Sequence, residues 1–251
     1  MKKITMIGTG YVGLVSGTCL AELGHEVTGV DIDKTKIDNL NKGIIPIYEQ
    51  GLEELVKENV KQKRLFFTTN IDKAVKQSEI VFIGVGTPTA ADGSVNLEYV
   101  KSAAESIGKS MNGYKVIVDK STVPVGTGDF VANIIKKYYK GSFDVVSNPE
   151  FLREGTAVMD FMHPDRIVIG NGSTKAEKIM RELYSSFEAD SLVFTDIKTA
   201  ELVKYASNAF LATEISFINS IANLCEKLGA DVEKVAMGMM LDKRIGTKAF
   251  L

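Results

Sequence analysis

A cluster of glycines near the start of the chain has the spacing of a phosphate-binding turn. Gly8, Gly10 and Gly13 form a G-x-G-x-x-G pattern that follows the apolar run 4–7 and precedes a predicted helix reaching Leu23. In such a turn the first glycine permits the tight bend, the second lets the backbone approach a pyrophosphate, and the third lets helix and strand pack closely. The N–H groups and partial positive charge at the helix N-terminus attract phosphates. The pattern therefore predicts a dinucleotide site.

An acidic residue ends the next predicted strand, which spans residues 26–30. Asp31 lies about 20 residues beyond the glycines, where a carboxylate hydrogen-bonds the ribose hydroxyls of adenosine. A negative side chain there repels a 2′-phosphate, so we expect NAD rather than NADP. The alternative is a glycine-rich turn with a solvated aspartate. It is disfavoured because strand, glycines, helix and acid coincide.

Two later loops follow predicted strands and carry hydroxyl side chains. Thr87 lies in the loop 86–89, and Thr122 lies in the loop 120–124. Ligands of open α/β sheets bind at the carboxyl ends of the strands, so both loops could reach the same site. Because Thr-Pro pairs are also common in plain turns, the spacing alone leaves both interpretations open.

Two pairs of polar residues, each four apart, could carry acid–base chemistry. Glu150 and Glu154 share a face if their turn is helical, and they could then act on a water as general base. A solvated charged loop is the alternative. Lys204 and Asn208 share a face of a predicted long helix and could stabilise an oxyanion. Here the alternative is that Glu201, three residues earlier, pairs with Lys204 on a water-exposed face.

The elements that would position these residues alternate along the chain. Short apolar runs predict strands, and amphipathic runs between them predict helices. This alternation is typical of a Rossmann-like α/β fold, with a doubly wound, mostly parallel sheet and right-handed crossovers. The predicted strands are 4–7, 26–30, 65–68, 80–84, 115–119, 143–147, 166–170 and 192–195. Apolar positions at helical spacing predict helices over 97–111, 130–138 and 179–187.

The pattern changes beyond the eighth predicted strand. Residues 196–228 include neither proline nor glycine, which predicts one helix of about 50 Å. Gly229 is expected to end it, and Asp231 to cap a second, shorter helix. We therefore expect a Rossmann-like domain over 1–195 and the start of an all-helical domain over 196–251. The apolar positions of the long helix fit packing on its own sheet as well as contact with a second subunit.

Composition and charge narrow the class of protein. The 251 residues include 30 Lys and Arg against 32 Asp and Glu, and this net charge of −2 offers no basic footprint for nucleic acid or an anionic membrane. No apolar run reaches the ~18 residues of a membrane span, and no signal peptide is recognisable, so we expect a cytoplasmic protein. Cys19 and Cys225 are too few for a disulfide framework, and we expect structural thiols and no metal.

Seven segments follow one another in a recognisable order along the chain: MIGTGYVGLVSG, VGTPT, KSTVPVGT, SNPEFLREGTAVMDF, PDRIVIG, ELVKYASNAFLATEISFINSIANLCE and DKRIG. They resemble the segments of the nucleotide-sugar 6-dehydrogenases, and most closely those of the UDP-glucose 6-dehydrogenases. The resemblance implies an NAD-dependent oxidation of the primary alcohol of UDP-glucose to the carboxylate of UDP-glucuronate, by two successive hydride transfers. It also implies a homodimer built on the long helix, with no nucleic-acid or membrane partner.

The resemblance also implies roles for individual residues. Thr122, Glu150 and Glu154 would organise water and the reacting carbon, with Glu154 as general base. Lys204 and Asn208 would hold the developing oxyanion. The cofactor would contact Gly8, Gly10, Tyr11, Val12, Gly13, Asp31, Lys36, Thr87, Thr122 and Glu154. The nucleotide sugar would contact Phe151, Leu152, Arg153, Glu154, Lys204, Asn208 and Arg244.

The chain departs from the family after the last matching segment. The family's catalytic cysteine lies in a Gly-Gly-x-Cys-x-Pro-Lys-Asp segment, and a UDP-binding domain follows, but neither is found in these 251 residues. We therefore expect this chain to bind NAD without completing the four-electron reaction. Alternatives are a GDP-mannose or UDP-N-acetylmannosamine dehydrogenase, a single-step β-hydroxyacid-type dehydrogenase, and a non-catalytic NAD-binding module.

Overall fold

The chain folds into an α/β sheet unit followed by helices. The computed structural model describes residues 1–242 and 245. Two compact units can be distinguished, Met1–Leu202 and Val203–Leu251. Helix α9 (Ile197–Leu228) begins in the first unit and continues into the second. The division between the units thus falls inside α9, later than the boundary at residue 195 that the sequence predicts.

Eight strands form one sheet in the order β3-β2-β1-β4-β5-β6-β7-β8. All neighbouring strands are parallel except β6 and β7, which are antiparallel. The predicted fold class is confirmed, and each strand begins and ends within one residue of its prediction. The strands are β1 (Lys3–Ile7), β2 (Glu26–Val30), β3 (Leu65–Thr68), β4 (Ile80–Ile83), β5 (Val116–Asp119), β6 (Asp144–Ser147), β7 (Ile167–Gly170) and β8 (Leu192–Thr195).

The helices that connect the strands mostly follow the predicted apolar spacing. One prediction is shifted: the helix expected over 179–187 spans Thr174–Leu183, because the Ser173 hydroxyl oxygen accepts the N–H of Ala176 and caps an earlier start. The connecting helices are α1 (Tyr11–Glu22), α2 (Lys34–Leu40), α3 (Leu52–Lys61), α4 (Ile71–Gln77), α5 (Glu98–Ser110), α6 (Thr127–Tyr138), α7 (Ala157–Met162), α8 (Thr174–Leu183) and the short 3₁₀ helix η1 (Ala189–Ser191).

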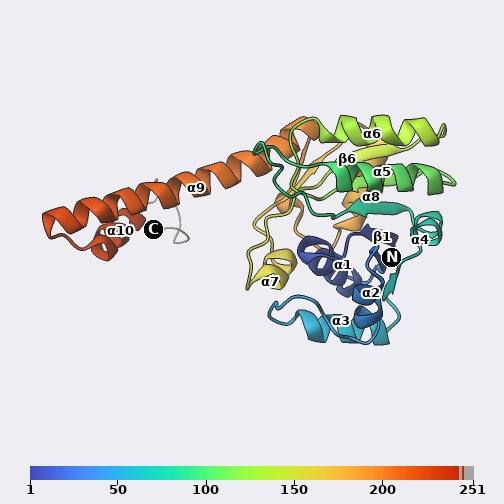
Figure 1. Ribbon diagram of the computed structural model, residues 1–251, viewed down its shortest axis with the longest axis horizontal. Helices are drawn as coiled ribbons and strands as arrows, with labels where there is room; N and C mark the ends of the chain where they lie inside the picture. Colours follow the sequence, from blue (N-terminus) through green and yellow to red (C-terminus); the bar gives the residue numbers. More distant parts are fainter. Residues whose placement is uncertain (243–244, 246–251) are drawn as a thin grey trace. The chain divides into compact units, whose positions relative to one another are not determined.

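Alternate side chains of the central strands point into two separate cores. In β4, Ile80 and Phe82 belong to one core, and Val81 and Ile83 belong to the other, as the two-residue period of a strand requires. Helices α1, α3, α7 and α8 cover the first face of the sheet, and α4, α5 and α6 cover the second. Figure 1 shows α5 and α6 side by side. Because β1 to β6 are parallel to one another, their carboxyl ends all lie along the same side of the sheet, which we call the carboxyl edge.

The ends of the last two helices are set by local hydrogen bonds. The Asp196 carboxylate accepts the N–H (2.9 Å) and the hydroxyl (2.6 Å) of Thr199 at the start of α9. Gly229, with φ of +66°, ends that helix, and Asp231 caps α10 (Val232–Met240), as predicted. Among residues 1–242 and 245, no helix combines the length and the apolar character needed to cross a membrane.

Candidate functional site

The glycine-rich turn joins β1 to α1 at the carboxyl edge of the sheet. Gly8 has φ of +92°, a conformation that side chains disfavour, and its N–H donates to the Val30 carbonyl (2.8 Å). A Cβ on Gly13 would lie 2.0 Å from the Gly8 carbonyl oxygen. At Gly10 a Cβ would meet no described atom within 4 Å, and no described side chain caps α1. The turn can therefore present backbone N–H groups to a phosphate.

Asp31 lies beside this turn, where β2 ends. Its Oδ2 accepts the N–H (3.0 Å) and the hydroxyl (2.8 Å) of Thr9 and the ammonium of Lys36 (2.9 Å), and its Oδ1 accepts the Asp33 N–H (3.1 Å). Burial by itself would raise the pKa of Asp31, but these hydrogen bonds outweigh it and lower the pKa to about 2. The structure thus brings the predicted cofactor residues Asp31 and Lys36 together as an ion pair, with Asp31 ionised at neutral pH.

The loops that follow β4 and β5 are tied together by their own hydroxyls. The Thr87 hydroxyl donates to the Thr122 carbonyl (2.9 Å), and the Ser121 hydroxyl donates to a carbonyl of the neighbouring loop (2.7 Å). Lys120 is buried, and its ammonium donates to the Asn148 side-chain oxygen (3.2 Å) after β6. The two loops meet at one edge, as expected. However, the hydroxyls of Thr87 and Ser121 serve the fold, whereas Thr122 is partly exposed.

The segment after β6 is not helical. Residues 148–156 lie outside any helix or strand, and the Glu150 carboxylate accepts the N–H of Leu152 (2.7 Å) in a local turn. Glu150 and Glu154 therefore do not share a helix face, because the turn between them binds its own backbone instead of starting a helix. Glu154 is exposed, and Glu150 is half-buried.

The predicted substrate-contacting residues of this segment make contacts within the protein. The Arg153 guanidinium forms two hydrogen bonds with the Asp160 carboxylate of α7 (3.1 and 2.6 Å). The Arg166 guanidinium lies 3.9 Å from the centre of the Phe151 ring, and Leu152 packs against the first core. These contacts hold the segment on the sheet and define where its acidic residues lie.

The acidic segment is nonetheless joined to the first residue of α1 through Glu49. The Tyr11 hydroxyl donates to the Glu49 carboxylate (3.1 Å). The pKa of Tyr11 is raised, first by burial, then by this hydrogen bond, and further by the charges of Glu49, Glu154 and Glu150. The segment that carries the predicted acid–base pair is thus linked to the glycine-rich turn, because the Gly155 N–H donates to the same Glu49 oxygen (3.0 Å) as the Tyr11 hydroxyl. Glu49 is a site residue that the sequence analysis missed, and no periodic pattern points to it.

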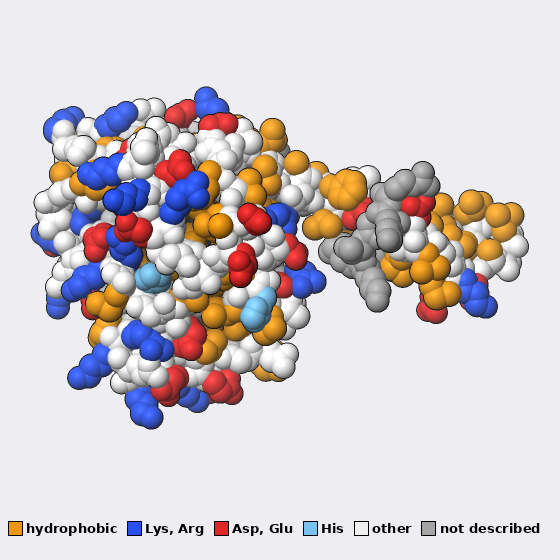
Figure 2. All heavy atoms as spheres, turned by 180° about the vertical axis from the view of Figure 1, so that it is seen from behind, with side chains coloured by type: hydrophobic (Ala, Val, Ile, Leu, Met, Phe, Trp, Pro, Cys, Tyr) orange, Lys and Arg blue, Asp and Glu red, His pale blue; other side chains and the backbone are white. Residues whose placement is uncertain are grey.

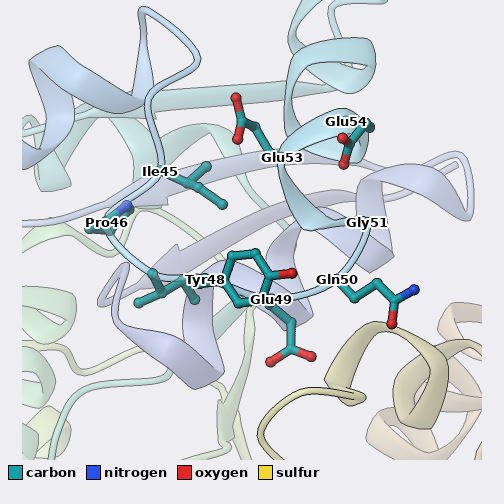
Figure 3. A pocket seen from close by; sticks show the side chains of 9 residues that line it. Ile45, Pro46, Tyr48, Glu49, Gln50, Gly51, Glu53 and Glu54 are labelled. Carbon is teal, nitrogen blue, oxygen red and sulfur yellow. The ribbon is translucent and has the colours of Figure 1, made fainter.

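A pocket of about 490 Å³ lies next to Glu49, on the loop between α2 and α3. Its lining includes the acidic residues Glu53 and Glu54, so it is a poor fit for an anionic phosphate. Figure 3 shows the Glu49 carboxylate on the opposite side of the loop from Glu53 and Glu54. The full lining is Ile45, Pro46, Ile47, Tyr48, Glu49, Gln50, Gly51, Glu53 and Glu54, and it includes none of the predicted site residues.

The predicted alternative of a water-exposed pair between Glu201 and Lys204 is wrong. Glu201 is 2% exposed, and its carboxylate accepts the N–H groups of Gly126 (2.6 Å) and Gly128 (2.8 Å) at the start of α6. Burial raises the pKa of Glu201, while these two hydrogen bonds act in the opposite direction. The side chain is therefore a buried link between α9 and α6 and does not lie on a solvated face.

A second buried carboxyl group lies next to Glu201, at the end of β5. Asp119 is 1% exposed. Burial first, and then the charge of Glu201, raise the pKa of Asp119 to about 8, although the Ser121 N–H acts in the opposite direction. Asp119 is therefore protonated at neutral pH. The burial of Asp119 and Glu201 is not predictable from the sequence, because nothing local distinguishes them from solvated acids.

The remaining predicted residues lie on α9 or beyond. Lys204 is buried and Asn208 is exposed, one turn apart on the helix. Arg244 lies outside the described residues. Cys19 is fully buried in α1, and burial followed by the charge of Glu22 raises the pKa of its thiol to about 12, as suits a structural thiol. Cys225 is also buried. Among residues 1–242 and 245, no group of three His, Cys, Asp or Glu side chains could hold a metal ion.

Two family patterns match the chain. Residues 2–188 match the UDP-glucose/GDP-mannose dehydrogenase family, NAD binding domain, and residues 198–251 match the family's central domain. The first match covers most of the Rossmann-like unit, including the glycine-rich turn, Asp31 and the segment with Glu150 and Glu154. It identifies NAD as the cofactor of this unit.

Proteins of this kind are similar to the chain over nearly all of its length. UDP-glucose 6-dehydrogenase TuaD of Bacillus subtilis (strain 168) is 59% identical over 250 residues, which are 99% of this chain and 54% of the relative. A UDP-glucose dehydrogenase from Pyrobaculum islandicum has a TM-score of 0.95 and 42% identity, covering 98% of this chain and 58% of that one. A GDP-mannose dehydrogenase from Pseudomonas aeruginosa has a TM-score of 0.92 and 36% identity, covering 96% and 57%. The chain thus spans a little over half the length of these proteins.

Proposed function

Because the chain belongs to the UDP-glucose/GDP-mannose dehydrogenase family, we propose that it forms the cofactor-binding part of an NAD-dependent nucleotide-sugar 6-dehydrogenase. One observation carries the proposal: the glycine-rich turn, with Asp31 beside it, is joined to the acidic segment, because Tyr11 and Gly155 both donate to the Glu49 carboxylate. A dinucleotide site with carboxylates next to it is what a dehydrogenase needs, because oxidation of an alcohol removes a hydride and a proton together.

The residues around the turn fit NAD. The pyrophosphate is expected at the N-terminus of α1, over Gly10, where a Cβ would meet no described atom within 4 Å. The adenosine ribose is expected at Asp31, which stays ionised because Lys36 and the Thr9 N–H hold its charge. When bound, NAD supplies the chemistry of a hydride acceptor. Asp31 at the same time disfavours the 2′-phosphate of NADP.

The acidic segment supplies the proton chemistry in this proposal. Glu154 is exposed, and the residue after it is bonded to the same carboxylate as Tyr11, so Glu154 would be the group that accepts a proton from water or from the alcohol. Glu150 and Thr122 would orient that water. Lys204 and Asn208, four apart on α9, would hold the negatively charged oxygen that develops on the reacting carbon's hydroxyl.

We further propose UDP-glucose as the sugar nucleotide. The support is graded similarity: curated relatives named UDP-glucose 6-dehydrogenase are 59% and 55% identical to this chain, whereas the GDP-mannose dehydrogenase is 36% identical. GDP-mannose and UDP-N-acetylmannosamine are the competing substrates.

The second unit supports the proposal of a homodimer. Three large apolar side chains on α9 recur every seven residues, so they share one helix face: Phe210, Phe217 and Leu224 are 62%, 49% and 49% exposed. Figure 2 shows apolar side chains, in orange, along this part of the chain. A face of this kind is a candidate for burial against a second copy of α9.

The test measures binding and turnover on one sample of the purified chain. The dissociation constants of NAD and NADP are measured by calorimetry in separate titrations of the chain. The absorbance of NADH is then followed with UDP-glucose, GDP-mannose or UDP-N-acetylmannosamine as the substrate. We expect NAD to bind much more tightly than NADP. Turnover is judged separately from binding, because this chain spans only 54% of the length of its relative from Bacillus subtilis. Absence of NAD binding contradicts the proposal. Sustained formation of about two NADH per UDP-glucose would overturn the sequence-based expectation that these 251 residues do not complete the reaction.

A further inference from the structure

Glu49 is a buried carboxylate that joins three segments far apart in the sequence. It lies in the loop between α2 and α3 and is 3% exposed. Its Oε2 accepts the Tyr11 hydroxyl (3.1 Å) and the Gly155 N–H (3.0 Å), and its Oε1 accepts the Ala157 N–H (2.9 Å). The glycine-rich turn, the acidic segment and the start of α7 therefore share one acceptor.

These three donors explain why a carboxylate can be buried at this position. A buried charge is tolerated only when hydrogen bonds replace its water, and both Glu49 oxygens are engaged. Two of the donors are backbone N–H groups, one of them on Gly155, the residue directly after Glu154. Glu49 therefore fixes the backbone directly after Glu154, and with it the place where the Glu154 side chain begins.

The same contact reaches the cofactor turn through a side chain. Tyr11 is the first residue of α1, next to Gly10, and its phenol is the group through which Glu49 reaches that turn. Without Glu49, the phenol would be left among the charges of Glu150 and Glu154, and the segment after Glu154 would lose two of its hydrogen bonds.

We propose that Glu49 is a positioning residue of the NAD site: it holds the Tyr11 phenol and the 150–156 segment together and so sets Glu154 against the glycine-rich turn. Glu49 acts through these groups and is not assigned a contact with the substrate or the cofactor. The proposal rests on the proposed function in one respect, namely that NAD is the ligand of the turn.

Glu49→Gln is the sharpest perturbation, because it keeps the size of the side chain and changes one acceptor into a donor. The new amide NH₂ must take the place of either Oε1 or Oε2. In the first orientation it faces the Ala157 N–H, and in the second it faces the Gly155 N–H. Either way two donors oppose each other, so one backbone group loses its partner. Tyr11→Phe removes only the phenol contact and leaves both backbone bonds in place.

The experiment is a double-mutant cycle on NAD affinity. NAD dissociation constants are measured by calorimetry for the wild-type chain, Glu49→Gln, Tyr11→Phe and the double variant. We expect Glu49→Gln to weaken NAD binding on the order of tenfold and Tyr11→Phe by less. The double variant should bind NAD more tightly than the product of the two single effects predicts, because both changes loosen the one hydrogen-bond network around Glu49. Equal NAD affinity of Glu49→Gln and wild type, or simple additivity, overturns the proposal.

A matched control separates positioning from stability. Asp144 accepts a hydrogen bond from the Tyr114 hydroxyl, and this tyrosine–carboxylate contact is part-buried like that of Tyr11 and Glu49, but it lies at the amino end of β6, away from the cofactor edge. Asp144→Asn should lower the midpoint of thermal unfolding while leaving NAD affinity within about twofold of wild type. If Glu49→Gln behaves in the same way, Glu49 has a structural role only.

Amide hydrogen exchange distinguishes failure of this proposal from failure of the proposed function. In Glu49→Gln, but not in Asp144→Asn, exchange should become faster at Gly155 or at Ala157, whichever N–H then faces the new amide NH₂. If the wild-type chain does not bind NAD, the proposed function fails, and exchange alone decides whether Glu49 holds the segment. Unchanged exchange at both amides contradicts the proposal whatever the affinity for NAD.

Discussion

Replacing Asp119 with asparagine should stabilise the protein at neutral pH and remove part of its pH dependence. Asp119 is buried at the end of β5 beside Glu201, and its pKa is raised to about 8 by burial and by the charge of Glu201. The carboxyl group is therefore protonated in the folded protein at pH 7. In the unfolded chain it ionises at its ordinary pKa of 3.8. Asparagine has nearly the same shape and stays neutral at every pH.

The sign and size of the effect follow from these two pKa values. A raised pKa in the folded state contributes stability that is complete below pH 3.8 and is lost as the pH rises to about 8, because unfolding then releases a proton. One proton corresponds to about 1.4 kcal/mol per pH unit. Between about pH 5 and about pH 7 the wild-type chain should lose up to about 2.7 kcal/mol through Asp119 alone, and less if water reaches the group. Asp119→Asn should not show this loss.

The assay is urea unfolding of both proteins at several pH values, followed by circular dichroism. The quantity of interest is the variant's free energy of unfolding minus that of wild type, which cancels the titration of other groups. We expect this difference to rise with pH up to about pH 8 and then to level off. Asp72→Asn, which replaces an exposed acid on α4, is the control for the chemical change itself and should alter the free energy of unfolding by less than about 0.5 kcal/mol. A flat or falling difference for Asp119→Asn would refute the reasoning.

Three further outcomes are expected. Gly13→Ala places a Cβ 2.0 Å from the Gly8 carbonyl oxygen, so it should cost about 1–3 kcal/mol of stability and weaken NAD binding. Gly17→Ala is the matched control, because the nearest atom to its Cβ would be 3.6 Å away. Equal behaviour of the two variants in urea unfolding and NAD titration would contradict this account. Burial lowers the pKa of His25 below its ordinary 6.5, so the free energy of unfolding should fall as the pH drops below about 6.5. His25→Asn should remove this fall, which thermal unfolding across that pH range would measure. Phe217→Asp should convert a dimer to a monomer in sedimentation velocity with little change in stability, and a wild-type chain that is already monomeric would remove the basis for the proposed dimer.

Patterns that depend on a few consecutive residues were predicted well. The continuous apolar runs mark all eight strands, and the absence of proline and glycine over 196–228 marks α9. The glycine-rich turn was also predicted with its structural context, because strand, turn and helix are neighbours in the chain. Segments that depend on capping were less accurate: Ser173 starts α8 earlier than the apolar spacing indicates.

The conformation of the acidic segment could not be predicted from spacing. Glu150 and Glu154 are four residues apart, but the Glu150 carboxylate binds the N–H of Leu152 and the segment stays non-helical. Similarly, Glu201 has the spacing of a solvated partner for Lys204, yet it is buried against the start of α6. Side-chain spacing does not show which partner a polar group takes, because competing local and distant partners have similar energies.

The sequence alone determines the parts of this protein whose physics is local: the alternation of strands and helices, the dinucleotide turn, and the acid that follows β2. Tertiary structure alone decides which polar groups share the cofactor edge. Glu49 meets Gly155 and Ala157 across 106 and 108 residues, and Glu201 meets Gly126 across 75. Periodicity reports backbone geometry and burial of neighbouring residues, whereas the partner of a buried carboxylate is selected by the path of the whole chain and by the cost of leaving its charge without hydrogen bonds.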